Sequence, residues 1–211
     1  MSKQGGVWVS GAMMDSSLIK GFKTDIEEVN LHLTADAQTR QDRAEPLPAE
    51  RYPQVMTRNR DQKIGRLPDF CNAGAFWTLS GAFADVLRQF NLGQTRLYPV
   101  QVFQFDRKTP VEGEYFTLAF GETKDTLLPE VSRLRRPSYS SPDALEWKLI
   151  IGGYKDGDVV LAPAALDGVD LWMESKLRSA FLLSDALVTA LKAAKLTRRL
   201  SLRRCTVESE H

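Results

Sequence analysis

Two stretches of this sequence repeat the same order of residues, and this repeat constrains the fold more than any other feature. The first begins near residue 67 and runs Pro-Asp-Phe, then Phe-Trp-Thr-Leu-Ser-Gly-Ala-Phe. The second begins near residue 168 and runs Val-Asp-Leu-Trp, then Phe-Leu-Leu-Ser-Asp-Ala-Leu. Four pairs share an offset of 104 residues: Ser80 with Ser184, Phe83 with Leu187, Leu87 with Leu191, and Leu92 with Leu196. Self-similarity at a fixed spacing indicates a duplicated structural unit.

Each stretch predicts an extended segment containing an aspartate, a strand, a helix and a closing strand. The hydroxyl groups of Ser80 and Ser184 are expected to cap the two helices, because serine accepts bonds from unpaired amides of the first turn. Apolar residues at i, i+3, i+4 and i+7 follow each serine, the period of an amphipathic helix. Asp69 and Asp170 are expected to hold turns through side-chain to backbone bonds. The two units span about residues 67–103 and 168–206.

The rest of the chain predicts short strands separated by polar segments. Alternation and β-branched residues indicate strands at 7–9, 29–33, 97–105, 114–120, 147–151 and 159–161. Residues 35–65 contain three prolines and many charges, which favours a long surface connector. We therefore expect an α+β fold with mixed or antiparallel sheets and a few amphipathic helices. Residues 1–60 would form N-terminal strands and a polar connector, and residues 61–211 a domain holding both repeats.

Composition narrows the functional class. The chain has 211 residues, with 28 basic and 27 acidic residues and a net charge of +1. Such balance argues against a dedicated nucleic-acid or membrane-surface binder, and no apolar run approaches the roughly 20 residues that span a bilayer. The only cysteines, Cys71 and Cys205, are expected to be buried free thiols. These features favour a cytoplasmic protein, whose oligomeric state the sequence leaves open.

Residues with recognisable catalytic or metal-binding spacing are missing. His32 is the only histidine besides the terminal His211, and two distant cysteines with one internal histidine do not supply a zinc site. No glycine-rich phosphate loop or nucleophile motif occurs. We expect no catalytic residue, no metal and no cofactor.

One pattern supports an alternative. Pro68-Asp69 followed by Glu146-Trp147-Lys148 imitates the acidic motif of metal-dependent nucleases, in which two carboxylates hold Mg²⁺ and a lysine stabilises the attacking water or the phosphate. The separation is long for such a motif, and Asp69 has a repeat partner, Asp170, without that context. A metal-dependent nuclease or hydrolase using Asp69, Glu146 and Lys148 is thus the second hypothesis. A structural or regulatory module is the third.

The repeated units also carry a family resemblance. Arg66-Leu-Pro-Asp-Phe with Phe76-Trp-Thr-Leu-Ser, and later Val169-Asp-Leu-Trp with Phe181-Leu-Leu-Ser-Asp, resemble immunity protein family 11, formerly a domain of unknown function. The resemblance covers roughly residues 60–105 and 155–207. It implies a cytoplasmic antitoxin that binds and neutralises a secreted toxin, often a nuclease, by occluding or locking its active site. The toxin would be encoded by an adjacent gene of a polymorphic-toxin system and delivered by contact-dependent or type VI secretion during bacterial competition.

A basic segment near the C-terminus is the candidate partner-binding surface. Residues 186–204 contain no acidic residue and six basic ones: Lys192, Lys195, Arg198, Arg199, Arg203 and Arg204. Cations are favoured at a helix C-terminus, which accounts for Lys192, Lys195 and Arg199. Arg203 and Arg204 lie beyond that helix, and arginine is enriched at interface hot spots.

We expect the four tryptophans to pack in the core, and any exposed one to be a further hot-spot candidate.

Overall fold

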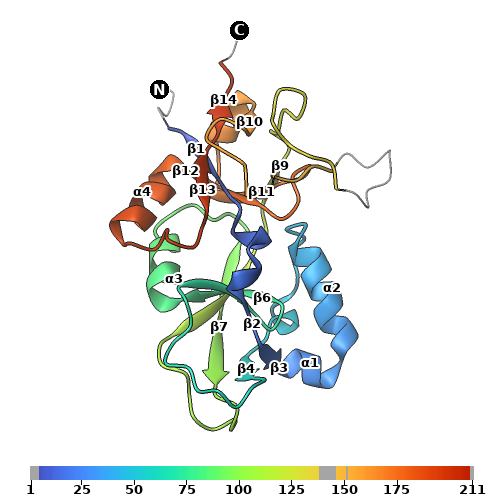
Figure 1. The fold of residues 1–211 in the computed structure, drawn as a ribbon, viewed down its shortest axis with the longest axis vertical. Helices are drawn as coiled ribbons and strands as arrows, with labels where there is room; N and C mark the ends of the chain where they lie inside the picture. The colour runs from blue at the N-terminus through green and yellow to red at the C-terminus, as the bar shows by residue number, and fades with distance from the viewer. Residues whose placement is uncertain (1–4, 138–145, 151, 210–211) are drawn as a thin grey trace. The chain divides into compact units, whose positions relative to one another are not determined.

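The computed structural model (Figure 1) describes residues 5–137, 146–150 and 152–209 of the chain. Its contacts divide the chain into two compact units. Unit 1 comprises Met1–Met14, Phe90–Gly93 and Glu122–His211, and unit 2 comprises Asp15–Gln89 and Gln94–Gly121. The boundary expected at residue 60 therefore falls inside unit 2. Within the described residues, mixed sheets occur together with four α-helices, which confirms the α+β class.

Unit 1 is built on a sheet that joins the two ends of the sequence. The strand order is β13 (Leu202–Arg204), β1 (Val7–Ser10), β12 (Phe181–Ser184), β11 (Leu171–Glu174) and β9 (Thr123–Lys124). β1 is antiparallel to both of its neighbours, whereas β9 runs parallel to β11. Helix α4 (Asp185–Ala193) follows β12 directly and packs against it (Figure 1). A parallel pair, β10 (Val160–Leu161) and β14 (Thr206–Val207), and a 3-10 turn, η4 (Pro163–Leu166), complete the unit with η1 (Ala12–Met14).

Unit 2 contains a seven-stranded sheet that curls back on itself. The order is β2 (Ile19–Lys20), β5 (Phe70–Ala73), β6 (Phe76–Ser80), β8 (Tyr115–Ala119), β7 (Arg96–Phe103), β4 (Val55–Arg58) and β3 (Phe22–Thr24). The strands at its two edges, β2 and β3, are separated only by Gly21, so the edges meet. Helices α1 (Asp25–Val29) and α2 (Leu31–Gln41) follow one another at an angle, with only Asn30 between them (Figure 1). The other elements are α3 (Gly81–Leu87), η2 (Ser16–Leu18) and η3 (Ala49–Arg51).

Each unit has its own apolar core. In unit 1 the fully buried Trp172 packs with residues of β1, β12 and the 149–165 region, including Val9, Leu161 and Leu182. In unit 2 the core comprises Met56, Phe76 and neighbours from most strands of the curled sheet. The two expected free thiols, Cys71 and Cys205, are confirmed as buried and unpaired with each other. Burial raises the pKa of Cys71 to about 12.

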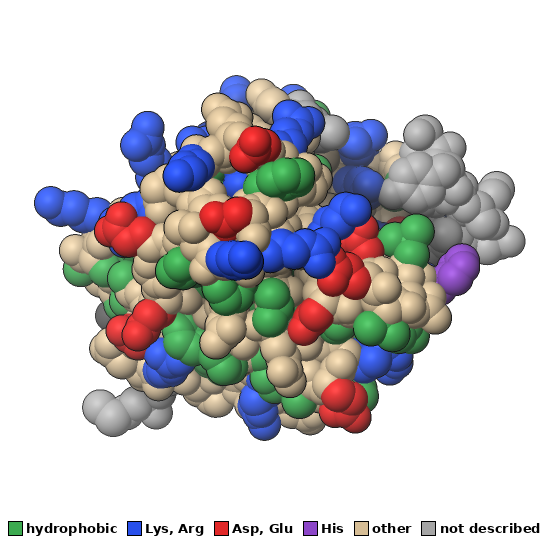
Figure 2. Space-filling model, turned by 90° about the horizontal axis from the view of Figure 1, so that it is seen from below, with side chains coloured by type: hydrophobic (Ala, Val, Ile, Leu, Met, Phe, Trp, Pro, Cys, Tyr) green, Lys and Arg blue, Asp and Glu red, His purple; other side chains and the backbone are tan. Residues whose placement is uncertain are grey.

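The strand predicted at 29–33 is wrong. This stretch holds the end of α1 and the start of α2, and the Asn30 side chain caps α2 by accepting a bond from the His32 amide at 2.9 Å. Five alternating residues fit a short strand and a helix start equally well, and the asparagine cap decides for the helix. His32, the only histidine among the described residues, is exposed (Figure 2, purple).

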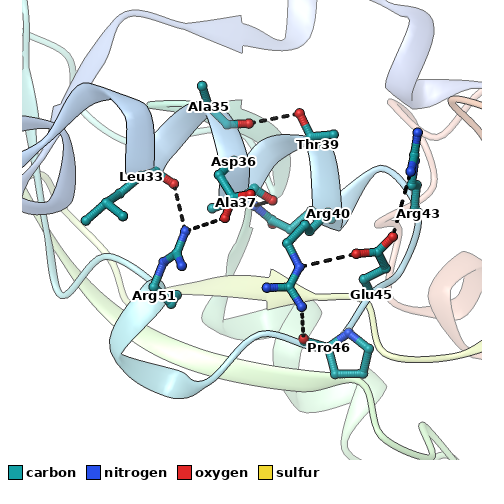
Figure 3. Close-up of polar contacts among 11 residues, drawn as sticks. Leu33, Ala35, Asp36, Ala37, Thr39, Arg40, Arg43, Glu45, Pro46 and Arg51 are labelled. Atoms are coloured by element: carbon teal, nitrogen blue, oxygen red, sulfur yellow. Dashed lines mark hydrogen bonds and ion pairs between the residues drawn. The ribbon is translucent and has the colours of Figure 1, made fainter.

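The polar segment 35–65 is not a continuous connector. It contains most of α2, then η3 and β4. Only Thr34, Ala37 and Gln41 of α2 are buried, so the helix lacks an apolar stripe that a sequence pattern would reveal. Polar contacts fix the segment after it (Figure 3): Arg51 donates to Asp36 at 2.6 Å and Arg40 to Glu45 at 3.2 Å.

One further expected strand is also modified. The strand predicted at 147–151 is reduced to isolated bridges at Trp147 and Lys148, and Ile151, like His211, lies outside the described residues. Over the described part of the chain, no helix has the length and apolar character needed to cross a bilayer.

Candidate functional site

The sequence-selected Asp69 and Ser80 form a local clamp in unit 2. Ser80 is the N-cap of α3, and its Oγ accepts a bond from the Phe83 amide at 3.3 Å. The same hydroxyl donates to Asp69 Oδ1 at 2.8 Å, and the Ser80 amide donates to the Asp69 carbonyl at 3.1 Å. Because Asp69 immediately precedes β5 and Ser80 ends β6, the clamp closes the base of the β5–β6 hairpin.

Asp170 and Ser184 make the same contacts in unit 1. Ser184 Oγ accepts from the Leu187 amide at 3.2 Å and donates to Asp170 Oδ1 at 2.6 Å, and its amide donates to the Asp170 carbonyl at 3.0 Å. Asp170 precedes β11, and Ser184 ends β12 and caps α4. One difference is that Asp170 Oδ2 also accepts from the Asn91 amide at 2.9 Å. Both aspartates therefore fix the junction of a hairpin with a helix.

The basic residues selected from the sequence all lie in unit 1 and are all exposed: Lys192, Lys195, Arg198, Arg199, Arg203 and Arg204. The first is in the last turn of α4, the next three lie between α4 and β13, and the arginine pair is on β13. Among the described residues, none of the six has an acidic side chain within ion-pair distance. One carboxylate nevertheless lies close to the group, since Asp156 Oδ1 accepts a bond from the Arg204 backbone amide at 2.8 Å.

Trp8, which we expected in the core, lies among these cations. It sits on β1 opposite Arg204, and its side chain is half-buried. Lys192 Nζ lies 3.9 Å and Arg204 Cζ 5.9 Å from the centre of its ring, within the range in which cations are attracted to an indole face. Its Nε1 donates to Asp185 Oδ1 at 2.7 Å. The indole is thus held in one orientation, with cations from two elements beside it.

A second cation–aromatic pair lies on the other face of the sheet, because Arg203 is paired with Val9 whereas Arg204 is paired with Trp8, and neighbouring residues of a strand point to opposite faces. Arg203 Cζ lies 5.6 Å from the centre of the Tyr154 ring, whose hydroxyl donates to the Ser201 carbonyl. A Cβ at Gly11 would lie 2.4 Å from the Tyr154 hydroxyl, so glycine permits this approach. We name the group of Trp8, Lys192 and Arg204 the cationic–aromatic surface.

The sequence contained a signal for Trp8 that went unused. Val7 and Val9 on either side of it are buried, and alternate residues of a strand point to opposite faces. If the valines face the core, Trp8 must point to the other face. Chemically, the surface combines guanidinium and ammonium donors with a flat apolar ring, a composition suited to carboxylate-bearing protein partners.

Comparison with known proteins identifies the group to which this chain belongs. Residues 12–201 match the Immunity protein family (Imm11). The chain is a member of that family. The match extends over most of residues 1–60, for which the sequence alone offered no family motif. No curated protein matches this Imm11 chain.

The residues of the alternative hydrolase site are not assembled in one unit of this Imm11 protein. Glu146 and Lys148 belong to unit 1 and Asp69 to unit 2. Glu146 Oε1 accepts from Arg178 at 2.6 Å, and Lys148 is in a backbone bridge with Arg135. Across the described ranges, no three His, Cys, Asp or Glu side chains are grouped to hold a metal ion. No contact therefore favours the hydrolase hypothesis.

Proposed function

We propose that this protein is an antitoxin that binds a cognate bacterial toxin and blocks it without catalysing a reaction. The match to the Imm11 family over residues 12–201 carries this proposal. The toxin is the secreted product of an adjacent gene, delivered through type VI or contact-dependent secretion, and it acts on nucleic acid. The antitoxin meets it in the cytoplasm and either occludes its active site or holds it in an inactive shape.

The cationic–aromatic surface, with Lys195, Arg198, Arg199 and Arg203 beside it in sequence, is the proposed contact. Nucleases hold catalytic metal ions with carboxylates, so a surface of exposed cations complements such a site. Trp, Tyr and Arg are also the residues most often found at the energetic centre of interfaces. Trp8 is already fixed by Asp185, so little side-chain freedom is lost when it binds.

The function is tested by co-expressing the chain with the toxin domain encoded beside its gene. We expect protection of the cells, a one-to-one complex, and a dissociation constant in the nanomolar range, equivalent to about −12 kcal/mol. Absence of both binding and protection would refute the proposal. It would also fail if the purified chain cleaved nucleic acid in magnesium at a rate that Glu146→Gln abolished.

The contact surface has its own test. Arg203→Glu combined with Arg204→Glu should slow toxin association at low salt and weaken binding, because both changes oppose the proposed charge match. Arg133→Glu combined with Arg135→Glu is the matched control, since both side chains are exposed in the same unit. Equal binding by the two double variants would place the interface elsewhere.

A further inference from the structure

Unit 2 contains a groove that the proposed function does not use. Its volume is about 1040 Å³, and its lining comes from three stretches of chain: residues 49–55 without Arg51, residues 98–103, and residues 110–116 without Glu112. It lies beside the part of β7 that β4 does not cover, because β4 pairs with only residues 101–103 of the eight-residue β7. Small-molecule sites usually occupy roughly 300–1,000 Å³, so this groove is at the upper limit for a small ligand.

Two stacked tyrosines form part of the groove wall. The rings of Tyr52 and Tyr98 are 4.7 Å apart at an interplanar angle of 27°. Tyr52 is only 3% exposed, yet its hydroxyl has no hydrogen-bond partner in the described part of the chain. Burial, and then the neighbouring Tyr98, raise the pKa of Tyr52 to about 12, so the hydroxyl stays protonated near neutral pH. A buried donor without an acceptor is unfavourable, and an incoming acceptor would relieve that cost.

The charges of the groove have a single sign. Among its lining residues, Glu50 and Glu114 are the only charged ones, and both are exposed. Neither carboxylate has a basic side chain within ion-pair distance in the described ranges. The remaining lining is dominated by aromatic residues, valines and prolines. Such a groove complements a ligand that carries apolar groups, a hydrogen-bond acceptor and a positive charge.

We propose that this groove binds an extended segment of the cognate toxin that carries apolar side chains and a lysine or arginine. A polypeptide supplies all three features, since its backbone carbonyls offer an acceptor for Tyr52. This inference rests on the proposed antitoxin function and adds a contact of opposite charge to the cationic–aromatic surface.

The first experiment reverses the charges of the groove in the full chain. Glu50→Lys combined with Glu114→Lys should weaken binding to the toxin protein at least tenfold without changing the unfolding midpoint. Asp61→Lys combined with Glu112→Lys is the matched control, because both residues are exposed and lie outside the groove lining. Equal weakening by both pairs, or by neither, would overturn the inference while leaving the antitoxin function in place.

The second experiment removes the unpartnered hydroxyl. Tyr52→Phe should leave the stability of the free protein unchanged or higher, yet weaken toxin binding by about fivefold, the fold-change expected for one lost hydrogen bond of about 1 kcal/mol. Hydrogen exchange in the complex should also slow within residues 49–55 and 98–103. If Tyr52→Phe leaves the affinity unchanged and exchange at these residues does not slow in the complex, the groove is not a toxin contact. If the wild-type chain does not bind the toxin at all, both proposals are refuted.

Discussion

At the scale of single residues, two buried tyrosines of unit 2 differ in how their hydroxyls are satisfied. The hydroxyl of Tyr115 accepts from the Leu67 amide at 2.9 Å and donates to the Glu112 carbonyl. The hydroxyl of Tyr52 has no such partner among the described residues. The two side chains are buried to a similar extent, with Tyr115 4% and Tyr52 3% exposed. Comparing them therefore separates the contribution of the hydroxyl's hydrogen bonds to stability from that of the buried ring.

Tyr115→Phe should therefore lower the free energy of unfolding by about 1–3 kcal/mol, because it leaves a buried amide and carbonyl unpaired. Tyr52→Phe should cost nothing or stabilise slightly. Urea unfolding followed by fluorescence measures both. Equal losses would mean that the Tyr52 hydroxyl has an acceptor in the free protein.

The capping serines give a second prediction at this scale. Ser80→Ala and Ser184→Ala should each cost about 1 kcal/mol of stability, since each removes a helix cap. Ser16→Ala is a control, because Ser16 is exposed and no bond to its hydroxyl is seen. Urea unfolding of the three variants is the measurement. A loss at one capping serine only would show that the clamps differ in strength despite their matching contacts.

At the scale of elements, the two clamps join equivalent pieces of structure. In both, an aspartate precedes an antiparallel hairpin, and the serine that ends the hairpin starts a helix. The sequence repeat predicts an extended segment, a strand, a helix and a closing strand, and the elements follow in that order in both stretches: β5, β6, α3 and β7, then β11, β12, α4 and β13. That the full stretches 67–103 and 168–206 derive from one duplicated unit stays a prediction.

Glu174 is the residue that ties β11 to the chain after β9. Its carboxylate is 3% exposed and accepts bonds from the Thr126 amide and hydroxyl, the Leu127 amide, and Trp172 Nε1. Glu174→Gln should lower the free energy of unfolding by about 1–3 kcal/mol, because the amide group places a donor against other donors. Calorimetry measures the loss, with Glu208→Gln at an exposed position as the control. An unchanged midpoint would contradict this role.

The elements that the sequence predicted are those with strong local signals. The capping serines and the apolar strands around 97–105 and 114–120 have such signals, and the structure has β7 and β8 there. Helix α2 has none, because its buried face is small and partly polar. The position of Trp8 among Lys192 and Arg204 was not predictable either, since it depends on β1 pairing with β13 across almost the whole chain. The groove likewise depends on the long-range pairing of β4 with β7.

At the scale of the whole molecule, neither unit is a continuous piece of sequence. Unit 1 has three stretches and unit 2 has two. β1 lies between β12 and β13, and its Val7 and Val9 are almost fully buried. The N-terminal strand is therefore an internal part of the unit 1 sheet.

Deleting residues 1–14 should consequently disrupt unit 1 while leaving the sheet of unit 2 intact, because unit 2 takes no strand from those residues. Amide exchange followed by mass spectrometry should show rapid exchange across β11 and β12 and continued protection across β6 and β8. Retained protection in β12 would mean that the sheet tolerates the loss of β1, an internal strand.

The pairing of β1 between β12 and β13 also affects how the protein forms during synthesis. The strand is made more than 170 residues before its two partners, β12 and β13, since Ser10 ends β1 and Phe181 begins β12. Until the ribosome has added them, β1 has nothing to pair with, whereas every strand of unit 2 is available by residue 119. A chain whose translation stops early can thus complete unit 2 but not the cationic–aromatic surface. If that surface binds the toxin, only chains translated through β13 protect the cell.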